Sequence, residues 1–257
     1  MNKNFILKKN KNSVYAYVKK FPDFLKTISA KDEVNDGNNK TQCDKYKRTN
    51  SDKLDDTDNS FAKTCAKIAQ HQKDIIGDVE TNKPSLCKYI NYWFYNKINS
   101  TTKTTYYSLL NKFFTEIDDL KFCTNYHYKN INTDSYTELT KLYDLYDNFN
   151  KFKDESLKAK PSKCDDVKQC IEIYEEYAPK CREDYNNELC INLINFKYEY
   201  DKHRSNAISC QSSMTYLEPI KSDLASIVLL PFVSMTLVSF IFIFLYKVCN
   251  NTILNIF

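Results

Sequence analysis

The chain has 257 residues, 10 cysteines and only two glycines, Gly37 and Gly77, and its formal net charge is +4. So few glycines exclude the glycine-rich phosphate loops and the nucleophile elbow of several enzyme classes. They also disfavour β-sandwiches and barrels, whose turns need positive φ at many positions. Only three of the 37 basic residues are arginine and 33 acidic residues are interspersed with them, so nucleic-acid binding is not indicated.

Apolar residues recur at helical spacing from the start of the chain. Residues 14–28 place Val14, Val18, Phe21 and Leu25 near one stripe, interrupted by Pro22. A second stripe runs through 61–75. Residues 30–60 between them are rich in Asn, Asp, Lys and Thr, and we expect them to form a polar loop.

The most regular apolar face lies at residues 86–98. Trp93, the only Trp, sits in the middle of this face, so we expect it to anchor a core and not a ligand. Similar stripes predict helices at 106–120, 139–149, 167–177 and 189–198, with a charged linker at 150–163 and a connection through Pro179 and Cys181 between the last two. No period-2 strand is evident, so the fold class is mainly α: a disulfide-stapled bundle of six to eight helices over residues 1–200.

A membrane anchor is predicted near the C-terminal end. Residues 201–223 resemble a stalk of small polar residues, and residues 224–246 form an uncharged run of 23 residues between Asp223 and Lys247. Such a helix is about 35 Å long, enough to cross a hydrocarbon core of about 30 Å. Pro231 within it is tolerated in membrane helices. A short tail, 247–257, follows the span, and the first 20 residues hold no apolar run of signal-peptide length.

The orientation of the large domain stays open, because Lys221 and Lys247 flank the span on both sides. The domain faces either an oxidising exterior or a cytosol. Nine cysteines precede the span, and their crowding after residue 164 favours disulfides and therefore the exterior, although small buried thiols in a cytosolic protein remain an alternative. The candidates for disulfides are Cys43, Cys65, Cys87, Cys123, Cys164, Cys170, Cys181, Cys190 and Cys210.

An odd number of cysteines leaves at least one thiol unpaired in a monomer. We expect the spare thiol to be Cys210 or Cys43, because each lies in a poorly patterned stretch. Cys249 follows the span, on the opposite side of the membrane. At this position it is either palmitoylated or an unmodified thiol.

Catalytic and metal-binding patterns are not found in the sequence. No C-x-x-C occurs, and His71, His127 and His203 are far from metal-ligand spacing and from any nucleophile motif. Paired carboxylates such as Glu175-Glu176 are typical of solvated faces. We therefore expect no enzymatic activity, metal or cofactor. The glycosylation sequons at Asn39 and Asn99 carry little weight in an Asn-rich chain.

One segment carries a resemblance to a known family. Residues 87–98, CKYINYWFYNKI, resemble the C-x-x-[LI]-N-Y-W-[LF]-Y-[DN]-x-[IV] segment of the Plasmodium interspersed repeat (PIR) superfamily, in particular the VIR proteins of Plasmodium vivax and its simian-parasite relatives. Its central positions here are Cys87, Asn91, Tyr92, Trp93 and Tyr95. The surroundings are similar as well: an upstream Cys65, the string LYDLYD at 142–147, IYEEY at 173–177 within the cysteine cluster, and the C-terminal span. The long loop at 30–60 and the short tail depart from the family pattern.

The resemblance implies a helical, non-enzymatic variant antigen. Such a protein would be exported to the infected red cell or its membranes and act in antigenic variation, immune evasion or adhesion. Two hypotheses follow. In the first, a membrane-anchored domain contacts unidentified host or parasite proteins from an oxidising exterior. In the second, a cytosol-facing, tail-anchored adaptor acts in trafficking. A membrane-bound enzyme would need a cluster of titratable groups, which the sequence does not display.

Overall fold

The computed structural model describes residues 13–55, 57, 60–77, 82–126, 131–158, 164–220 and 240–241. Within these residues the fold is helical and contains no strand, only an isolated bridge between Leu54 and Ile98. The α-helices are α1 (Phe21–Ala30), α2 (Asn38–Thr49), α3 (Ser60–Ile76), α4 (Asn82–Asn96), α5 (Tyr106–Glu116), α6 (Thr133–Ser156), α7 (Asp166–Glu183) and α8 (Glu188–Arg204). The described residues also form four 3-10 helices: η1 (Val14–Lys20), η2 (Lys103–Thr105), η3 (Asp118–Asn125) and η4 (Gln211–Ser213).

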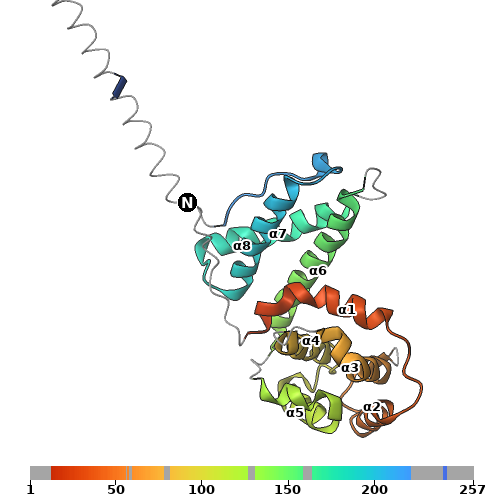
Figure 1. Cartoon of the computed structure of the whole chain (residues 1–257). Helices are drawn as coiled ribbons and strands as arrows, with labels where there is room; N and C mark the ends of the chain where they lie inside the picture. Colours follow the sequence, from red (N-terminus) through yellow and green to blue (C-terminus); the bar gives the residue numbers. More distant parts are fainter. Residues whose placement is uncertain are drawn as a thin grey trace, which may run out of the picture.

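The helices form two lobes, which the long helix α6 connects (Figure 1). The N-terminal lobe contains α1 to α5, and the C-terminal lobe contains α7, α8 and the segment 205–220. Asparagine side chains begin both α6 and α8: Asn132 accepts a hydrogen bond from the Ser135 amide, and Asn187 accepts one from the Cys190 amide. These caps satisfy amide groups that a helix leaves without an internal partner.

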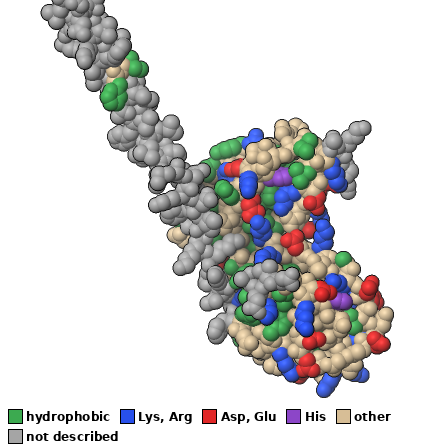
Figure 2. Space-filling model, viewed as in Figure 1, with side chains coloured by type: hydrophobic (Ala, Val, Ile, Leu, Met, Phe, Trp, Pro, Cys, Tyr) green, Lys and Arg blue, Asp and Glu red, His purple; other side chains and the backbone are tan. Residues whose placement is uncertain are grey.

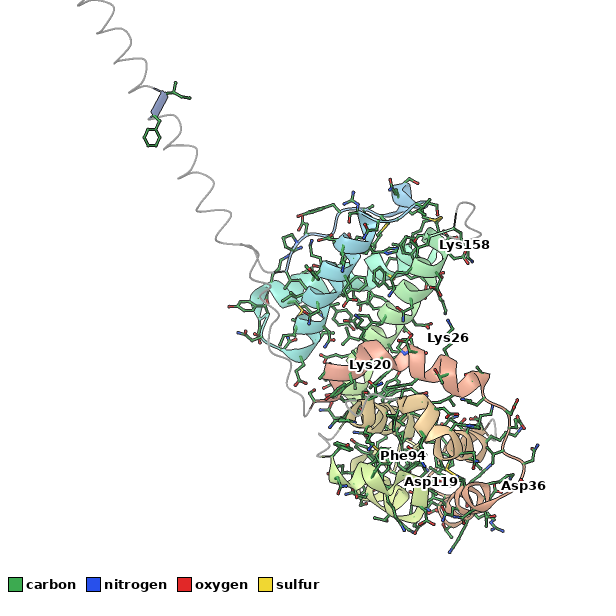
Figure 3. All side chains as sticks on the ribbon, viewed as in Figure 1. Lys20, Lys26, Asp36, Phe94, Asp119 and Lys158 are labelled. Atoms are coloured by element: carbon green, nitrogen blue, oxygen red, sulfur yellow. A yellow bond between two sulfur atoms is a disulfide. The ribbon has the colours of Figure 1, made fainter. Side chains whose placement is uncertain are left out.

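A continuous hydrophobic core runs through both lobes. In the N-terminal lobe it consists mainly of aromatic rings, and Phe94 points into its centre (Figure 3). The Phe94 ring lies 5.1 Å from that of Phe113 and 6.2 Å from that of Tyr46. In the C-terminal lobe Phe196 packs edge-on against Phe149, with 5.1 Å between ring centroids. The helical bundle expected from apolar periodicity is confirmed for the described residues.

The prediction of a polar loop over residues 30–60 is wrong for its central part, which forms α2. Only Asn39, Cys43 and Tyr46 of this helix are buried, so its apolar signal consists of two positions three residues apart. A disulfide from Cys43 to Cys65 fastens α2 to α3, and the Tyr46 hydroxyl donates to the Leu109 carbonyl of α5 at 2.8 Å. These tertiary contacts hold a helix whose composition by itself favours a loop.

Two helices also extend further than predicted. Helix α6 continues to Ser156, through half of the expected linker at 150–163. Helix α7 continues through Pro179 to Glu183, so the connection to α8 is the short turn 184–187. A proline removes one helical hydrogen bond, and packing of Ala178 and Cys181 on either side of Pro179 keeps the last turn in place.

The prediction of a stalk over residues 201–223 is wrong for residues 201–220. Helix α8 reaches Arg204, and the chain then returns along the C-terminal lobe. Met214, Leu217 and Ile220 are buried, and they lie three residues apart in a stretch that is neither helix nor strand. The hydroxyl of Tyr174 donates to the Glu218 carbonyl at 2.7 Å and that of Tyr200 donates to the Thr215 carbonyl at 2.9 Å. The helical domain therefore extends to about residue 220.

The predicted membrane span at 224–246 lies outside the described residues, apart from Phe240 and Ile241, which are helical. In the part of the chain that the structure does describe, no helix combines the length and the apolar character needed to cross a bilayer. The span and the tail at 247–257 stay predictions.

Candidate functional site

The family-like segment lies in α4 and forms part of the core. Cys87 and Asn91 are fully buried, and Tyr95 is almost so. Trp93 is 8% exposed, and its ring stacks on that of Phe61 with 5.2 Å between centroids. These four residues therefore form part of the core of the N-terminal lobe.

Tyr92, in the same segment, is only partly buried and faces α6. Its ring stacks on Tyr136 at 5.4 Å and on Tyr143 at 6.1 Å, and its hydroxyl lies 3.3 Å from the hydroxyl of Thr140. Burial, followed by the carboxylates of Asp147 and Asp144, raises the pKa of Tyr143 to about 12. This row of tyrosines joins α4 to α6 and ends at Tyr143, which faces an open groove.

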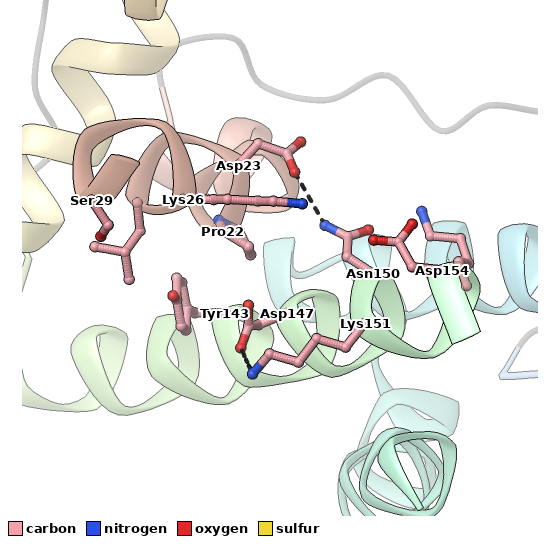
Figure 4. A pocket seen from close by; sticks show the side chains of 11 residues that line it. Pro22, Asp23, Lys26, Ser29, Tyr143, Asp147, Asn150, Lys151 and Asp154 are labelled. Carbon is pink, nitrogen blue, oxygen red and sulfur yellow. Dashed lines mark hydrogen bonds and ion pairs between the residues drawn. The ribbon is translucent and has the colours of Figure 1, made fainter. Parts of the chain in front are cut away.

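The groove lies between α1 and α6 and has a volume of about 600 Å³ (Figure 4). This volume lies within the range of small-molecule pockets. Pro22, Leu25 and Tyr143 supply apolar surface. The other lining residues are polar or charged: Asp23, Lys26, Ser29, Asp147, Asn150, Lys151, Lys153 and Asp154. Leu25, which the sequence pattern placed on a core stripe, is 40% exposed at the rim.

Some of the charges in the groove are paired and others are not. Lys151 and Asp147 form an ion pair at 2.7 Å, and the Asn150 amide donates across the groove to Asp23 at 3.4 Å. The side chains of Lys26 and Asp154 form no ion pair or hydrogen bond with another described residue. Lys26 projects from α1 towards the C-terminal lobe (Figure 3). The groove thus offers a cation on α1 and an anion on α6 that have no partner among the described residues, beside an apolar surface.

The face drawn in Figure 2 shows no field of a single sign. Lysines and arginines are mixed with acidic side chains over both lobes on the face drawn in Figure 2. Ion pairs such as Lys141–Glu176 at 3.2 Å and Arg182–Glu218 at 2.7 Å account for part of this mixing. A nucleic-acid interface concentrates positive charge on one face, and this face does not.

The structure pairs eight of the nine disulfide candidates. The disulfides are Cys43–Cys65, Cys87–Cys123, Cys164–Cys210 and Cys181–Cys190. The spare thiol is Cys170, so the expectation that Cys210 or Cys43 would be unpaired is wrong. Cys170 lies inside α7, buried against α6, where its sulfur donates to the Leu145 carbonyl at 3.5 Å. Poor local patterning was a misleading signal, because pairing depends on which cysteines the fold brings together. Cys249 lies outside the described residues.

Titratable groups with shifted pKa values are scattered through the core. Burial lowers the pKa of Lys88 in α4 to about 8, against a smaller opposing effect of Glu188. Burial raises the pKa of the Cys170 thiol to about 12. Burial and Lys153 lower the pKa of His203, whose Nε2 lies 2.7 Å from the Ser156 hydroxyl.

No group of three or more His, Cys, Asp or Glu side chains suited to a metal ion occurs among the residues that the structure describes. His71 lies 3.6 Å from Asp74 on the surface, far along the chain from His203, and His127 is outside the described residues.

The two sequons differ in their surroundings. Asn39 is 6% exposed, and its amide donates to Gln70 at 3.0 Å and to Asp119 at 2.8 Å, so a glycan on it is incompatible with this packing. Asn99 accepts hydrogen bonds from Thr101 and Thr102 in an exposed turn.

Comparison with known proteins places the chain in a family. A family model described as Plasmodium vivax Vir protein matches residues 12–225, which is most of the chain. No curated protein and no solved structure matches it. The matched range begins just before the described domain and includes α4, all four disulfides and the segment 205–220. The chain belongs to the Plasmodium vivax Vir protein family of the PIR superfamily.

Proposed function

We propose that this protein is a membrane-anchored variant antigen, exported to the infected red blood cell, which contacts host or parasite proteins and contributes to immune evasion or adhesion. Family membership supports a variant antigen. The single observation that carries the exterior orientation is the pairing of eight cysteines in four disulfides. Disulfides persist in oxidising compartments and are rare in a reducing cytosol.

The disulfides suit a protein whose surface varies. Three of them are buried, and they join α2 to α3, α4 to η3, and α7 to α8. Each contributes about 2–4 kcal/mol, mainly by restricting the unfolded chain. A scaffold held in this way retains its fold while exposed positions change, because most surface substitutions alter stability by only about 0.5 kcal/mol.

Protease treatment of intact infected cells tests the orientation. If the domain faces the exterior, trypsin removes an epitope placed in the turn 184–187 without permeabilisation, and non-reducing mass analysis finds a single free thiol among the nine cysteines before the span. Cleavage only after permeabilisation, with nine free thiols, would instead support the cytosol-facing adaptor. An epitope on the tail at 247–257 is the matched control, since it lies beyond the proposed span and should show the opposite accessibility.

We further propose that the groove between α1 and α6 is the contact site for a partner protein. Charge complementarity indicates the occupant: a peptide segment with an apolar side chain between an acidic and a basic one. The apolar side chain would rest on Leu25 and Tyr143. The acidic one would pair with Lys26, and the basic one with Asp154, neither of which has another described partner.

Charge reversal tests this contact. Binding of the full-length protein to red cells should fall at least about tenfold in Lys26→Glu and in Asp154→Lys, because each change places like charges across the contact. Lys45→Glu is the matched control: Lys45 is an exposed lysine on α2, remote from the groove. Binding that is equal in all three variants and the wild type would refute the groove as the contact site while leaving the orientation untouched.

A further inference from the structure

The four disulfides differ in their access to solvent. The cysteines of three bridges are buried with at most 1% of their surface exposed: Cys43, Cys65, Cys87, Cys123, Cys181 and Cys190. Cys164 and Cys210 are only partly buried. A thiolate must approach a disulfide sulfur along the S–S axis to exchange with it, so access is one determinant of the rate. Exposure singles out the Cys164–Cys210 bridge.

The backbone at Cys210 is also unusual. Its φ is +61°, and it is the only non-glycine residue with positive φ in the described part of the chain. A side chain other than glycine is disfavoured in this left-handed region, so surrounding contacts must hold it there. The contacts include the bond to Cys164 and a hydrogen bond from the Ser213 amide to the Cys210 carbonyl at 3.0 Å. Breaking the bridge removes one of these restraints.

We propose that Cys164–Cys210 is a thiol–disulfide exchange site for a protein dithiol of the thioredoxin type. One thiolate of the dithiol attacks a sulfur of the bridge, and the other bridge sulfur leaves as a thiolate and takes up a proton. The second thiol of the dithiol, once deprotonated, attacks the mixed disulfide and releases the remaining cysteine as a thiolate, which is protonated in turn. The bridge is reduced to two thiols, and the dithiol is oxidised to a disulfide.

Reduction would change how residues 205–220 are attached. The bridge ties this segment to the start of α7, and hydrogen bonds from the Ile208 and Ser209 amides to the Ser156 carbonyl tie it to the end of α6, at 3.1 Å and 3.0 Å. After reduction only non-covalent contacts would hold the segment. Because the segment leads to the uncharged run at 224–246, the exchange would loosen the domain from its proposed anchor. The exchange chemistry does not depend on that anchor.

Differential alkylation of the full chain in mild detergent tests the order of reduction. Dithiothreitol is added at a fixed low concentration, free thiols are blocked with iodoacetamide in samples taken over time, and the protein is then unfolded, fully reduced and labelled with an isotopic form of the reagent. Peptide masses then report each cysteine. We expect Cys164 and Cys210 to be reduced together, at least about tenfold faster than the other six, and this preference to vanish in denaturant. Prior reduction of another bridge, or simultaneous reduction of all four, would overturn the proposal.

Two further measurements address the partner and the consequence. A thioredoxin whose second active-site cysteine is replaced should be trapped in a mixed disulfide on Cys164 or Cys210 only; trapping elsewhere, or none, counts against the site. Trypsin cleavage at the exposed Lys202 and Arg204 should accelerate several-fold after mild reduction. The Cys164→Ser/Cys210→Ser variant should show that faster cleavage without reductant, and Cys170→Ser is the control that keeps the bridge. Slow cleavage of the double variant would show that the bridge does not hold the segment.

Discussion

Replacing Trp93 by alanine tests the role of the family segment in the core. Trp93 is 8% exposed, stacks on Phe61 at 5.2 Å and lies 6.2 Å from Phe113. Truncation of a buried Trp to Ala costs about 3–5 kcal/mol, because the transfer free energy is lost and a cavity remains. The Phe61 stack contributes about 0.5–1.5 kcal/mol of this. We expect Trp93→Ala to lower the free energy of unfolding by about 4 kcal/mol, a large share of the 5–15 kcal/mol typical of domains.

Urea denaturation under non-reducing conditions measures this change. Far-ultraviolet circular dichroism is the suitable signal, because Trp93 is the only Trp and its fluorescence is lost in the variant. Tyr198→Ala is the matched control, since Tyr198 is an aromatic residue on α8 that is 60% exposed, and it should change the free energy by no more than about 0.5 kcal/mol.

A double-mutant cycle with Phe61→Ala isolates the ring stack. The two single changes should be non-additive by about 0.5–1.5 kcal/mol, because each removes the same contact. A loss within about 0.5 kcal/mol for Trp93→Ala would refute the core role and indicate that Trp93 is available to a ligand. Full additivity would refute only the contribution of the stack.

Three further predictions concern buried titratable groups. Burial lowers the pKa of Lys88 to about 8 from 10.5, so between these two pH values the unfolded state keeps a proton that the folded state has lost. The unfolding free energy of the wild type relative to Lys88→Met should therefore rise from pH 8 to pH 10.5. A difference that stays constant with pH in urea titrations would contradict this prediction. Partial burial likewise keeps the pKa of His203 below 6.5, so the wild type should lose more stability than His203→Gln as the pH falls through the window below 6.5. Equal losses in acid titrations would argue against a partly buried, neutral imidazole. The pKa of about 12 at Cys170 leaves almost no thiolate near pH 8, so iodoacetamide should label Cys170 only after unfolding. Rapid labelling of Cys170 in the folded protein, detected by peptide mass, would be inconsistent with its burial.

Local patterning predicted the helices that bury wide apolar faces. Helices α3, α4 and α5 each carry several apolar residues on one side, so their existence follows from a period of 3.6 residues. Helix α2 was not predicted, because its buried face consists of Asn39, Cys43 and Tyr46 and so carries only two apolar positions. The packing of segment 205–220 was not predicted because Met214, Leu217 and Ile220 are isolated among polar residues and bury their side chains outside any helix or strand.

The groove was not predictable in the same way. Leu25 belongs to an apolar stripe, and Lys26 and Asp154 belong to ordinary charged stretches of two helices more than 100 residues apart in the chain. They share a groove only because η1 and α1 pack against α6. No local pattern reports which of two charges lacks a partner, since that depends on the neighbouring helix.

The amino-acid sequence by itself determined the helical class, the core position of Trp93, the uncharged run at 224–246 and the segment that resembles the PIR superfamily. Each of these depends on residues close together in the chain. Tertiary structure decided that Cys170 is the spare thiol, that Cys210 pairs with Cys164, and that the segment after α8 packs on the domain. Disulfide pairing, grooves and the burial of weakly patterned segments are contacts between distant residues, and only the packing of the helices brings those residues together.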